Sequence, residues 1–222
     1  MSGKLIVLEG LDGSGKATQA KLLAETLLKT GSKVRQISFP NYESDSSALV
    51  RMYLSGQFGS SPGDVNAYAA SAFYAVDRYA GMKQDWGRFY EEGGILIADR
   101  YTTSNAVHQC CKLPEGSWDE YLDWLFHFEY RLLGLPEPDL VVYLQVPVSV
   151  NQELMTERYH GNEQRKDIHE KNTEYLMLAH RAADYCAGKY GWYTVNCLEN
   201  SGMRSIVSIS GDVLRAAETV LI

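Results

Sequence analysis

The chain has 222 residues, with 21 Lys and Arg against 28 Asp and Glu, a net charge of -7, and 45% apolar residues. This length and composition can bury a sizeable core as one large or two small domains. The acidic balance without a Lys/Arg run argues against nucleic-acid binding. The apolar stretches stay far short of the roughly 20 residues of a membrane helix. We therefore expect a soluble globular protein without nucleic-acid or membrane partners.

The N-terminal segment and the cysteines indicate the compartment. An apolar run begins at Leu5 and is ended by Glu9, which is too short and too soon charged for a signal peptide. The four cysteines lack metal-ligand spacing, and Cys110 and Cys111 are adjacent, a poor geometry for a disulfide. Free thiols are typical of reducing compartments, so the sequence predicts a cytoplasmic protein.

Short apolar runs alternate with longer helical patterns. The runs predict strands at Leu5–Leu8, Val34–Phe39, Ile95–Ala98, Leu140–Val146 and Trp192–Val195. Strands that alternate with helices form parallel βαβ units. Because no repeat or linker divides the chain, residues 1–222 are expected to form one domain. The predicted fold is a three-layer, doubly wound α/β fold in which helices flank a five-stranded parallel sheet.

The helical patterns complete this expectation. Helices are predicted at Ala17–Thr30, after Asp64, from Ser117 to Gly134, and at Gln152–Arg158, Ile168–Tyr190 and Ile206–Val220. The predicted buried seam of the second helix comprises Val65, Tyr68, Ala69, Ala72, Phe73 and Val76. That seam would leave Tyr74 and Arg78 on the opposite face, one turn apart. Ligands of such folds bind at the carboxyl ends of the strands.

A glycine-rich segment, Gly10–Thr18, joins the first predicted strand to the first helix. Its glycines let backbone N–H groups turn toward phosphate oxygens, and Lys16 can reach the β- and γ-phosphates. The alternative is a glycine-rich turn without a ligand. The spacing and context favour a P-loop, whose ATP-phosphate ligands would be Gly10, Gly13, Ser14, Gly15, Lys16, Ala17 and Thr18.

One P-loop position departs from the usual pattern. The residue after the lysine is normally Ser or Thr, whose hydroxyl binds Mg²⁺, but here it is Ala17. Thr18 is rotated about 100° around the helix and cannot simply replace it. We expect Mg²⁺ to be held by phosphates, water and a carboxylate elsewhere.

The third predicted strand delivers Asp99, Arg100 and Tyr101 to the same edge of the sheet. Asp99 can hold Mg²⁺ or its water there, and Arg100 can bind a second phosphate through two N–H groups. A local ion pair that caps the strand is the alternative.

Three blocks of sequence together resemble the thymidylate (dTMP) kinase family. They are Gly10-x-Asp12-Gly13-x-Gly15-Lys16-x-Thr18-Gln19, Phe39-Pro40, and Asp99-Arg100-Tyr101-x-x-Ser104-x-x-x-His108-Gln109. The similarity spans nearly the whole chain. It implies ATP-dependent phosphorylation of dTMP to dTDP in dTTP biosynthesis, with Mg²⁺, a five-stranded parallel sheet and a homodimer.

The resemblance also implies roles for single residues. Asp12 would approach the sugar 3′-hydroxyl and the phosphate, Tyr74 would stack on thymine, and Arg78 would contact thymine O4. Arg100 would clamp the monophosphate, and Ser104 and Asn105 would face the nucleoside. For Tyr74 and Arg78, an exposed surface pair remains the alternative. The implied dTMP site comprises Asp12, Phe39, Pro40, Tyr74, Arg78, Arg100, Ser104, Asn105, His108 and Gln109.

Two further positions depart from the family pattern. Tyr42 stands where the family often has an arginine that contacts phosphate, and Arg51 is a candidate replacement. His108 stands where a tyrosine normally helps to exclude a ribose 2′-hydroxyl, so selectivity for deoxyribose is open. We favour a hydrogen-bonded wall residue over an acid–base role for His108.

A polar segment, about residues 158–168, separates two predicted helices and contains a glycine, as expected of a lid over ATP. In the family, the transition-state arginine comes from the P-loop or from the lid. Gly13 occupies the P-loop position, so the resemblance assigns the role to Arg158 or Arg165. A solvated connector is the alternative for the other charged residues of the segment.

Two other functions stay open. One is a related nucleoside or nucleotide kinase of different base specificity, since a single methyl group separates dTMP from dUMP. The other is a nucleotide-binding module with weak catalysis, which Ala17 suggests. A switch GTPase is disfavoured because the sequence has no Asn-Lys-x-Asp segment.

Overall fold

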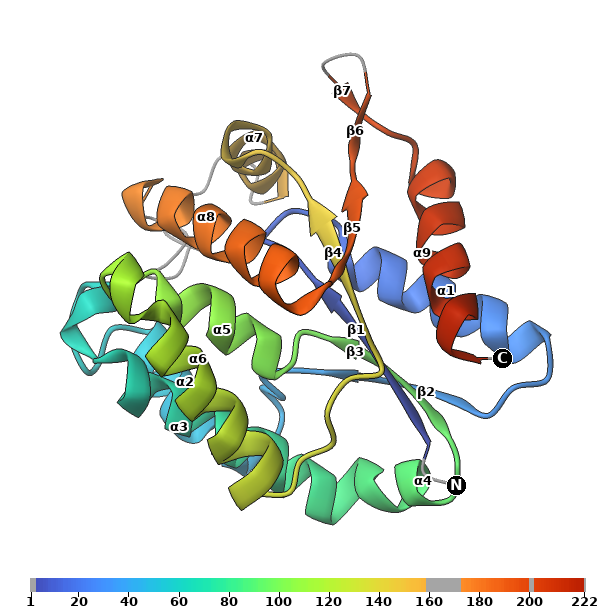
Figure 1. The fold of residues 1–222 in the computed structure, drawn as a ribbon, viewed down its shortest axis with the longest axis horizontal. Helices are drawn as coiled ribbons and strands as arrows, with labels where there is room; N and C mark the ends of the chain where they lie inside the picture. Colours follow the sequence, from blue (N-terminus) through green and yellow to red (C-terminus); the bar gives the residue numbers. More distant parts are fainter. Residues whose placement is uncertain (1–2, 159–172, 200–201, 222) are drawn as a thin grey trace.

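A five-stranded parallel sheet forms the centre of the protein (Figure 1). The structure is a computed structural model that describes residues 3–158, 173–199 and 202–221. The sheet order is β2-β3-β1-β4-β5. Its strands are β1 (Lys4–Glu9), β2 (Val34–Ser38), β3 (Ile95–Asp99), β4 (Leu140–Gln145) and β5 (Tyr193–Asn196). The predicted five-stranded α/β fold is confirmed, and each strand end differs from the expected one by at most one residue.

Strand register brings the carboxyl ends of three strands together. Leu8 of β1 and Ser38 of β2 both pair with Asp99 of β3. The segments that follow these strands therefore start at the same level of the sheet. They are the three sequence blocks: the glycine-rich loop, Phe39-Pro40 and the segment that begins at Asp99.

Helices cover both faces of the sheet, which gives the predicted three layers (Figure 1). Alternate residues of β1 enter different apolar clusters, because successive strand side chains point to opposite faces. Ile6 and Leu8 pack with α1 (Lys16–Lys29) and α9 (Ile206–Leu221). Leu5 and Val7 pack in the cluster of the other face. That face is covered by α5 (Thr102–Cys110), α6 (Trp118–Phe126) and α8 (Thr173–Tyr190), with α3 (Ala67–Gly81) beside them.

Shorter elements join these layers. They include α2 (Ala48–Leu54), α4 (Gly87–Glu91), α7 (Val148–Arg158), the π-helical turns η3 (Met82–Trp86) and η5 (His127–Leu132), and a hairpin of β6 (Leu198–Glu199) and β7 (Gly202–Met203). The sequence patterns did not predict α2, α5 or the hairpin. All nine residues of α5 are buried, so the amphipathic period that marks a surface helix is absent from it.

The predicted seam of α3 is wrong. The helix begins at Ala67 after Asn66, whose side chain accepts a hydrogen bond from the Ala69 N–H at 2.8 Å, rather than after Asp64. Tyr68 and Val76 are 38% and 51% exposed. The buried positions are mostly small or polar: Ala67, Ala70, Ser71, Ala75, Asp77 and Arg78. Small side chains allow close packing against α5, and the buried charges are satisfied by hydrogen bonds.

The predicted lid lies almost wholly outside the described residues, since α7 ends at Arg158 and α8 begins at Thr173. Within the described ranges, every helix is too short or too polar to cross a membrane.

Candidate functional site

A cavity of about 950 Å³ opens at the carboxyl ends of β1, β2 and β3. It brings together most residues that the sequence singled out. The lining includes Asp12, Gly13, Gly15, Lys16, Ala17, Thr18, Phe39, Pro40, Tyr74, Arg78, Asp99, Arg100, Ser104, Asn105, His108 and Gln109. Gly10 and Ser14 of the same loop are buried and are not part of this lining.

Backbone conformation explains the glycines of the P-loop. Gly10, Gly13 and Gly15 have φ values of 149°, 85° and 88°, where a side chain would be strained. A Cβ on Gly10 would also lie 2.8 Å from the Leu144 carbonyl oxygen. Helix α1 starts directly after Gly15, whose N-cap position supplies no side-chain hydrogen bond. The first-turn N–H groups of α1 are therefore oriented to bind an anion.

Lys16 is held under the P-loop. Its side chain is 6% exposed, and Nζ donates a hydrogen bond to the Leu11 carbonyl oxygen at 2.8 Å. Burial and the nearby Arg100 lower the pKa of Lys16 to about 8, although Asp12 and Asp99 oppose the shift. A bound polyphosphate would restore the charged form, because an adjacent anion favours the ammonium group.

Arg100 has the unusual backbone of a functional position. Its φ of 67° is the positive value rarely adopted by residues other than glycine. The guanidinium of Arg100 donates a hydrogen bond from NH2 to Asp12 Oδ1 at 2.5 Å and another from NH1 to Ser104 Oγ at 3.2 Å. Burial alone would lower the pKa of Arg100, but Asp12 and Glu9 raise it. Burial alone would raise the pKa of Asp12, but Arg100 and Lys16 hold it well below its usual range.

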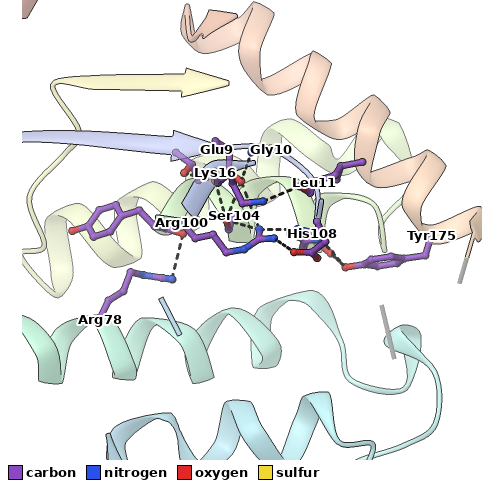
Figure 2. A network of polar contacts seen from close by, with 12 residues as sticks. Glu9, Gly10, Leu11, Lys16, Arg78, Arg100, Ser104, His108 and Tyr175 are labelled. Atoms are coloured by element: carbon purple, nitrogen blue, oxygen red, sulfur yellow. Dashed lines mark hydrogen bonds and ion pairs between the residues drawn. The ribbon is translucent and has the colours of Figure 1, made fainter. Parts of the chain in front are cut away.

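Glu9 is a site residue that the sequence analysis missed. It is fully buried at the end of β1, and its carboxylate accepts hydrogen bonds from Gly10 N at 3.0 Å and from Thr103 and Ser104 hydroxyls at 2.8 Å (Figure 2). Arg100 NH1 lies 3.8 Å from Glu9 Oε1. Glu9 thus ties the P-loop to α5. The signal was available, because Glu9 is a charged residue directly between an apolar strand and the first glycine.

Asp99 lines the cavity beside Lys16 and Arg100. Its Oδ1 atom is buried and makes no hydrogen bond to any described residue. Within residues 3–158, 173–199 and 202–221, no group of three or more His, Cys, Asp or Glu side chains could hold a metal ion. A single carboxylate oxygen without a protein partner fits an ion that otherwise keeps phosphate and water ligands.

Tyr74 and Arg78 of α3 also line the cavity. Arg78 is 1% exposed, so the alternative of an exposed surface pair is wrong. Its guanidinium donates to Glu129, from Nε at 2.7 Å and from NH2 at 2.5 Å. Burial would lower the pKa of Arg78, but the Glu129 carboxylate raises it. Nothing in the sequence pattern around Glu129 marked it as part of this site.

His108 lies in the wall of the cavity and is 8% exposed. Its Nε2 atom is 3.3 Å from Arg100 NH1, and Tyr175 of α8 donates to its carbonyl oxygen at 2.8 Å (Figure 2). These contacts fit the predicted hydrogen-bonded wall residue. On the same helix, Asn105 donates to the Ser71 carbonyl oxygen at 3.2 Å, which ties α5 to α3.

The segment after β2 supplies a further cation. Arg51 of α2 lines the cavity, and its NH1 donates to the carbonyl oxygens of Tyr42 and Ser44 at 2.9 and 2.8 Å. Asp77 of α3 accepts from Asn41 N at 2.8 Å and so anchors the same segment. Arg51 is therefore near the position where the family pattern predicts an arginine in place of Tyr42.

The two predicted lid arginines are not placed by the structure. Arg158 is the last residue of α7 and its side chain lies outside the described part, as does the whole of Arg165. The P-loop position is described. A Cβ on Gly13 would lie 3.2 Å from the Asn151 carbonyl oxygen and 3.3 Å from Met155 Cγ of α7.

Comparisons with known proteins give one consistent family. The family model described as thymidylate kinase matches residues 8–201. A thymidylate kinase of Mycobacterium tuberculosis is 33% identical over 178 residues, covering 77% of this chain and 79% of its own. A probable thymidylate kinase of Pyrococcus horikoshii is 34% identical and covers 67% of each chain. The solved structure of Candida albicans thymidylate kinase shares the fold, with a TM-score of 0.71 and 21% identity over 98% of this chain and 92% of the other. The chain belongs to the thymidylate kinase family.

Proposed function

We propose that this protein transfers the γ-phosphoryl group of ATP to dTMP and so forms dTDP. One observation carries the proposal. The two cations expected at the two phosphates, Lys16 and Arg100, line a single cavity together with Tyr74 and Arg78. A nucleotide-binding module would need the P-loop alone, whereas this cavity offers a second anion site and an aromatic surface beside it.

The chemistry requires little from the protein beyond position and charge. The dTMP phosphate is already an anion near neutral pH, so it needs no strong general base. Lys16 would hold the transferring phosphoryl group, and Arg100 would align the attacking phosphate. Asp12, now paired with Arg100, would release it to the substrate phosphate and turn to the sugar 3′-hydroxyl. Arg51 would add a second contact to the dTMP phosphate.

Asp99 is the proposed protein ligand of Mg²⁺ or of its water. Its unpartnered Oδ1 atom and the exposed, hydroxyl-free side chain of Ala17 support this assignment. The ion, when bound, supplies charge neutralisation for the phosphates of ATP. Asp99, held at the end of β3, fixes where that charge lies relative to Lys16.

The nucleoside would lie between α3 and α5. Tyr74 would stack on thymine, Arg78 would donate to thymine O4, and Ser104 and Asn105 would face the sugar. Phe39, Pro40 and Gln109 complete this wall. Because His108 offers a smaller ring than tyrosine, the ribose 2′-hydroxyl is less strongly excluded.

A lid arginine, Arg158 or Arg165, is the proposed transition-state cation. The close approach of α7 to Gly13 supports this choice, because an arginine at position 13 would meet the α7 backbone at its Cβ and would require a φ of 85°. The lid therefore remains as the source of the arginine that stabilises the transition state.

We further propose a cytoplasmic homodimer. Four free, buried cysteines fit a reducing compartment. Along α3, Tyr68, Val76 and Tyr79 form one exposed row at helical spacing. The ring centroids of Tyr68 and of Trp124 in α6 are 4.7 Å apart. A second copy of the chain would cover this row, since apolar faces of this kind mark interfaces.

A substrate panel tests the proposed function. The purified protein is incubated with ATP and Mg²⁺ and with dTMP, dUMP, dCMP, dGMP or thymidine. We expect dTDP as the main product and some dUDP. A preference for thymidine would indicate a nucleoside kinase, and ATP binding without any diphosphate product at any Mg²⁺ concentration would indicate a binding module. Lys16→Ala and Arg100→Ala should each lower kcat by orders of magnitude with the fold intact.

A further inference from the structure

Glu129 is a buried carboxylate that does not line the cavity yet controls an arginine that does. It is fully buried in η5, the π-helical turn that continues α6. Its two oxygens receive Arg78 Nε at 2.7 Å and Arg78 NH2 at 2.5 Å. A carboxylate and a guanidinium joined in this paired way have one favourable relative orientation. The orientation of Arg78 in the cavity is therefore set by Glu129.

A second contact fixes Glu129 itself. Thr102 Oγ1 donates to Glu129 Oε2 at 2.7 Å, and Thr102 is the first residue of α5. Glu129 consequently connects α3, through Arg78, with the start of the helix that carries Ser104, Asn105 and His108. The π-helical turn explains its reach, because an extra residue in the turn changes which side chain faces the neighbouring helix.

The remaining donors of Arg78 define what it can bind. Arg78 has five N–H groups, and Glu129 takes one from Nε and one from NH2. NH1 donates a long hydrogen bond of 3.4 Å to the Tyr101 carbonyl oxygen, which is the dashed line that starts at Arg78 in Figure 2. Among the described residues, the other N–H groups of NH1 and NH2 have no partner, and Arg78 lines the cavity. These N–H groups form the donor edge of Arg78. An arginine can only donate hydrogen bonds, so this edge favours a carbonyl oxygen over an amino group.

Burial raises the energetic cost of losing either partner of the Arg78–Glu129 pair. Both side chains are at most 1% exposed, so Arg78 without Glu129 would be an uncompensated buried charge. A base with a hydrogen-bond donor at the same place would leave Arg78 facing another donor, which costs far more than a missing methyl group.

We propose that Glu129 is a positioning residue that makes the site prefer a pyrimidine with a carbonyl at position 4 over one with an amino group. It does so by holding the donor edge of Arg78 toward the base. The inference rests on the proposed function, because it requires that a pyrimidine monophosphate occupies the Arg78 end of the cavity.

The test compares dUMP with dCMP, which differ in the base only at position 4 and its neighbouring ring nitrogen. Glu129→Gln keeps the shape of the side chain but replaces one acceptor with a donor. We expect the ratio of kcat/KM for dUMP to that for dCMP to fall at least tenfold. KM for the pyrimidine nucleotide should rise while KM for ATP stays within twofold. Asp139→Asn, which breaks the partly exposed pair with Lys4, is the control and should leave the ratio unchanged.

A double-mutant cycle separates positioning from general loosening. Arg78→Ala should lower the ratio, and adding Glu129→Gln to it should lower the ratio no further. Near-UV circular dichroism checks that each variant is folded. Thr102→Val is nearly isosteric and removes one hydrogen bond to Glu129, so it should lower the ratio about threefold. This variant provides the test if Glu129→Gln does not fold.

The outcomes are distinguishable. If the wild type phosphorylates neither dTMP nor dUMP, the proposed function fails. If it phosphorylates dUMP and a folded Glu129→Gln or Thr102→Val variant keeps the wild-type ratio, the role of Glu129 is wrong. An equal fall in the ratio caused by Glu129→Gln with and without Arg78 would also overturn it, because Glu129 would then act independently of Arg78.

Discussion

Asp12 of the P-loop and Arg100 at the end of β3 form an ion pair of 2.5 Å beside Lys16. The pair joins the proposed ATP side of the cavity to the proposed dTMP side before any substrate is bound. The dTMP phosphate must therefore compete with Asp12 for Arg100.

The pair predicts a specific acid response. The pKa of Asp12 is held well below the unfolded value of about 4, so the pair stabilises the fold at every pH above that value and loses this contribution as pH falls below it. Asp12→Asn should lower the free energy of unfolding at pH 7 by about 1–3 kcal/mol. Urea titrations of both proteins from pH 7 to pH 3 measure the difference, which should shrink at the acid end. A difference that grows below pH 4 would contradict the pairing.

Lys16 predicts an alkaline limit for ATP use. Its pKa of about 8 in the free protein means that the charged form is lost as pH rises through 8. We expect kcat/KM for ATP to fall above pH 8, while kcat declines only at higher pH, because bound phosphates favour the ammonium. In Lys16→Arg the fall should disappear, since arginine stays charged, whereas Lys21→Arg on the exposed face of α1 should behave as wild type. The same fall in Lys16→Arg would assign it to another group.

His108 predicts weak discrimination against ribose. His108→Tyr should raise the ratio of kcat/KM for dTMP to that for ribothymidine monophosphate about tenfold, because the larger ring occupies space near the sugar. The measurement is a pair of initial-rate series with ATP at saturation. Discrimination that is already strong in the wild type and unchanged by the substitution would show that another residue excludes the 2′-hydroxyl.

The exposed row of α3 predicts the oligomeric state. Light scattering after size exclusion should give twice the chain mass for the wild type. Val76→Asp should give a monomer, because the substitution places a charge in the buried interface. The control is Leu28→Asp on α1, because Leu28 is 52% exposed and Val76 is 51% exposed. This variant should stay dimeric. A monomeric wild type, or dissociation by both substitutions, would reject this interface.

The sequence predicted the parts of the molecule that depend on local patterns. Strand β3 is apolar on both faces and the P-loop has fixed spacing, so both are recognisable without tertiary information. The register of β1, β2 and β3 then brings the three blocks into one cavity, as expected for parallel strands.

The missed features depend on tertiary packing. The seam of α3 was assigned to large apolar residues, but close approach of α5 selects Ala70, Ser71 and Ala75. Buried Arg78 is stable only because Glu129, fifty-one residues later, lies opposite it. Glu129 is placed by a π-helical turn that has no sequence period of its own. Long-range pairs of this kind cannot be derived from a single sequence.

The most direct test of the proposed function is transfer of a labelled phosphoryl group. ATP labelled at the γ-phosphate is mixed with the purified protein, Mg²⁺ and dTMP, and the nucleotides are separated. The account predicts label in the β-phosphate of dTDP, at a rate that Arg100→Ala lowers by orders of magnitude. Label that stays in ATP, or appears only as inorganic phosphate, would contradict it.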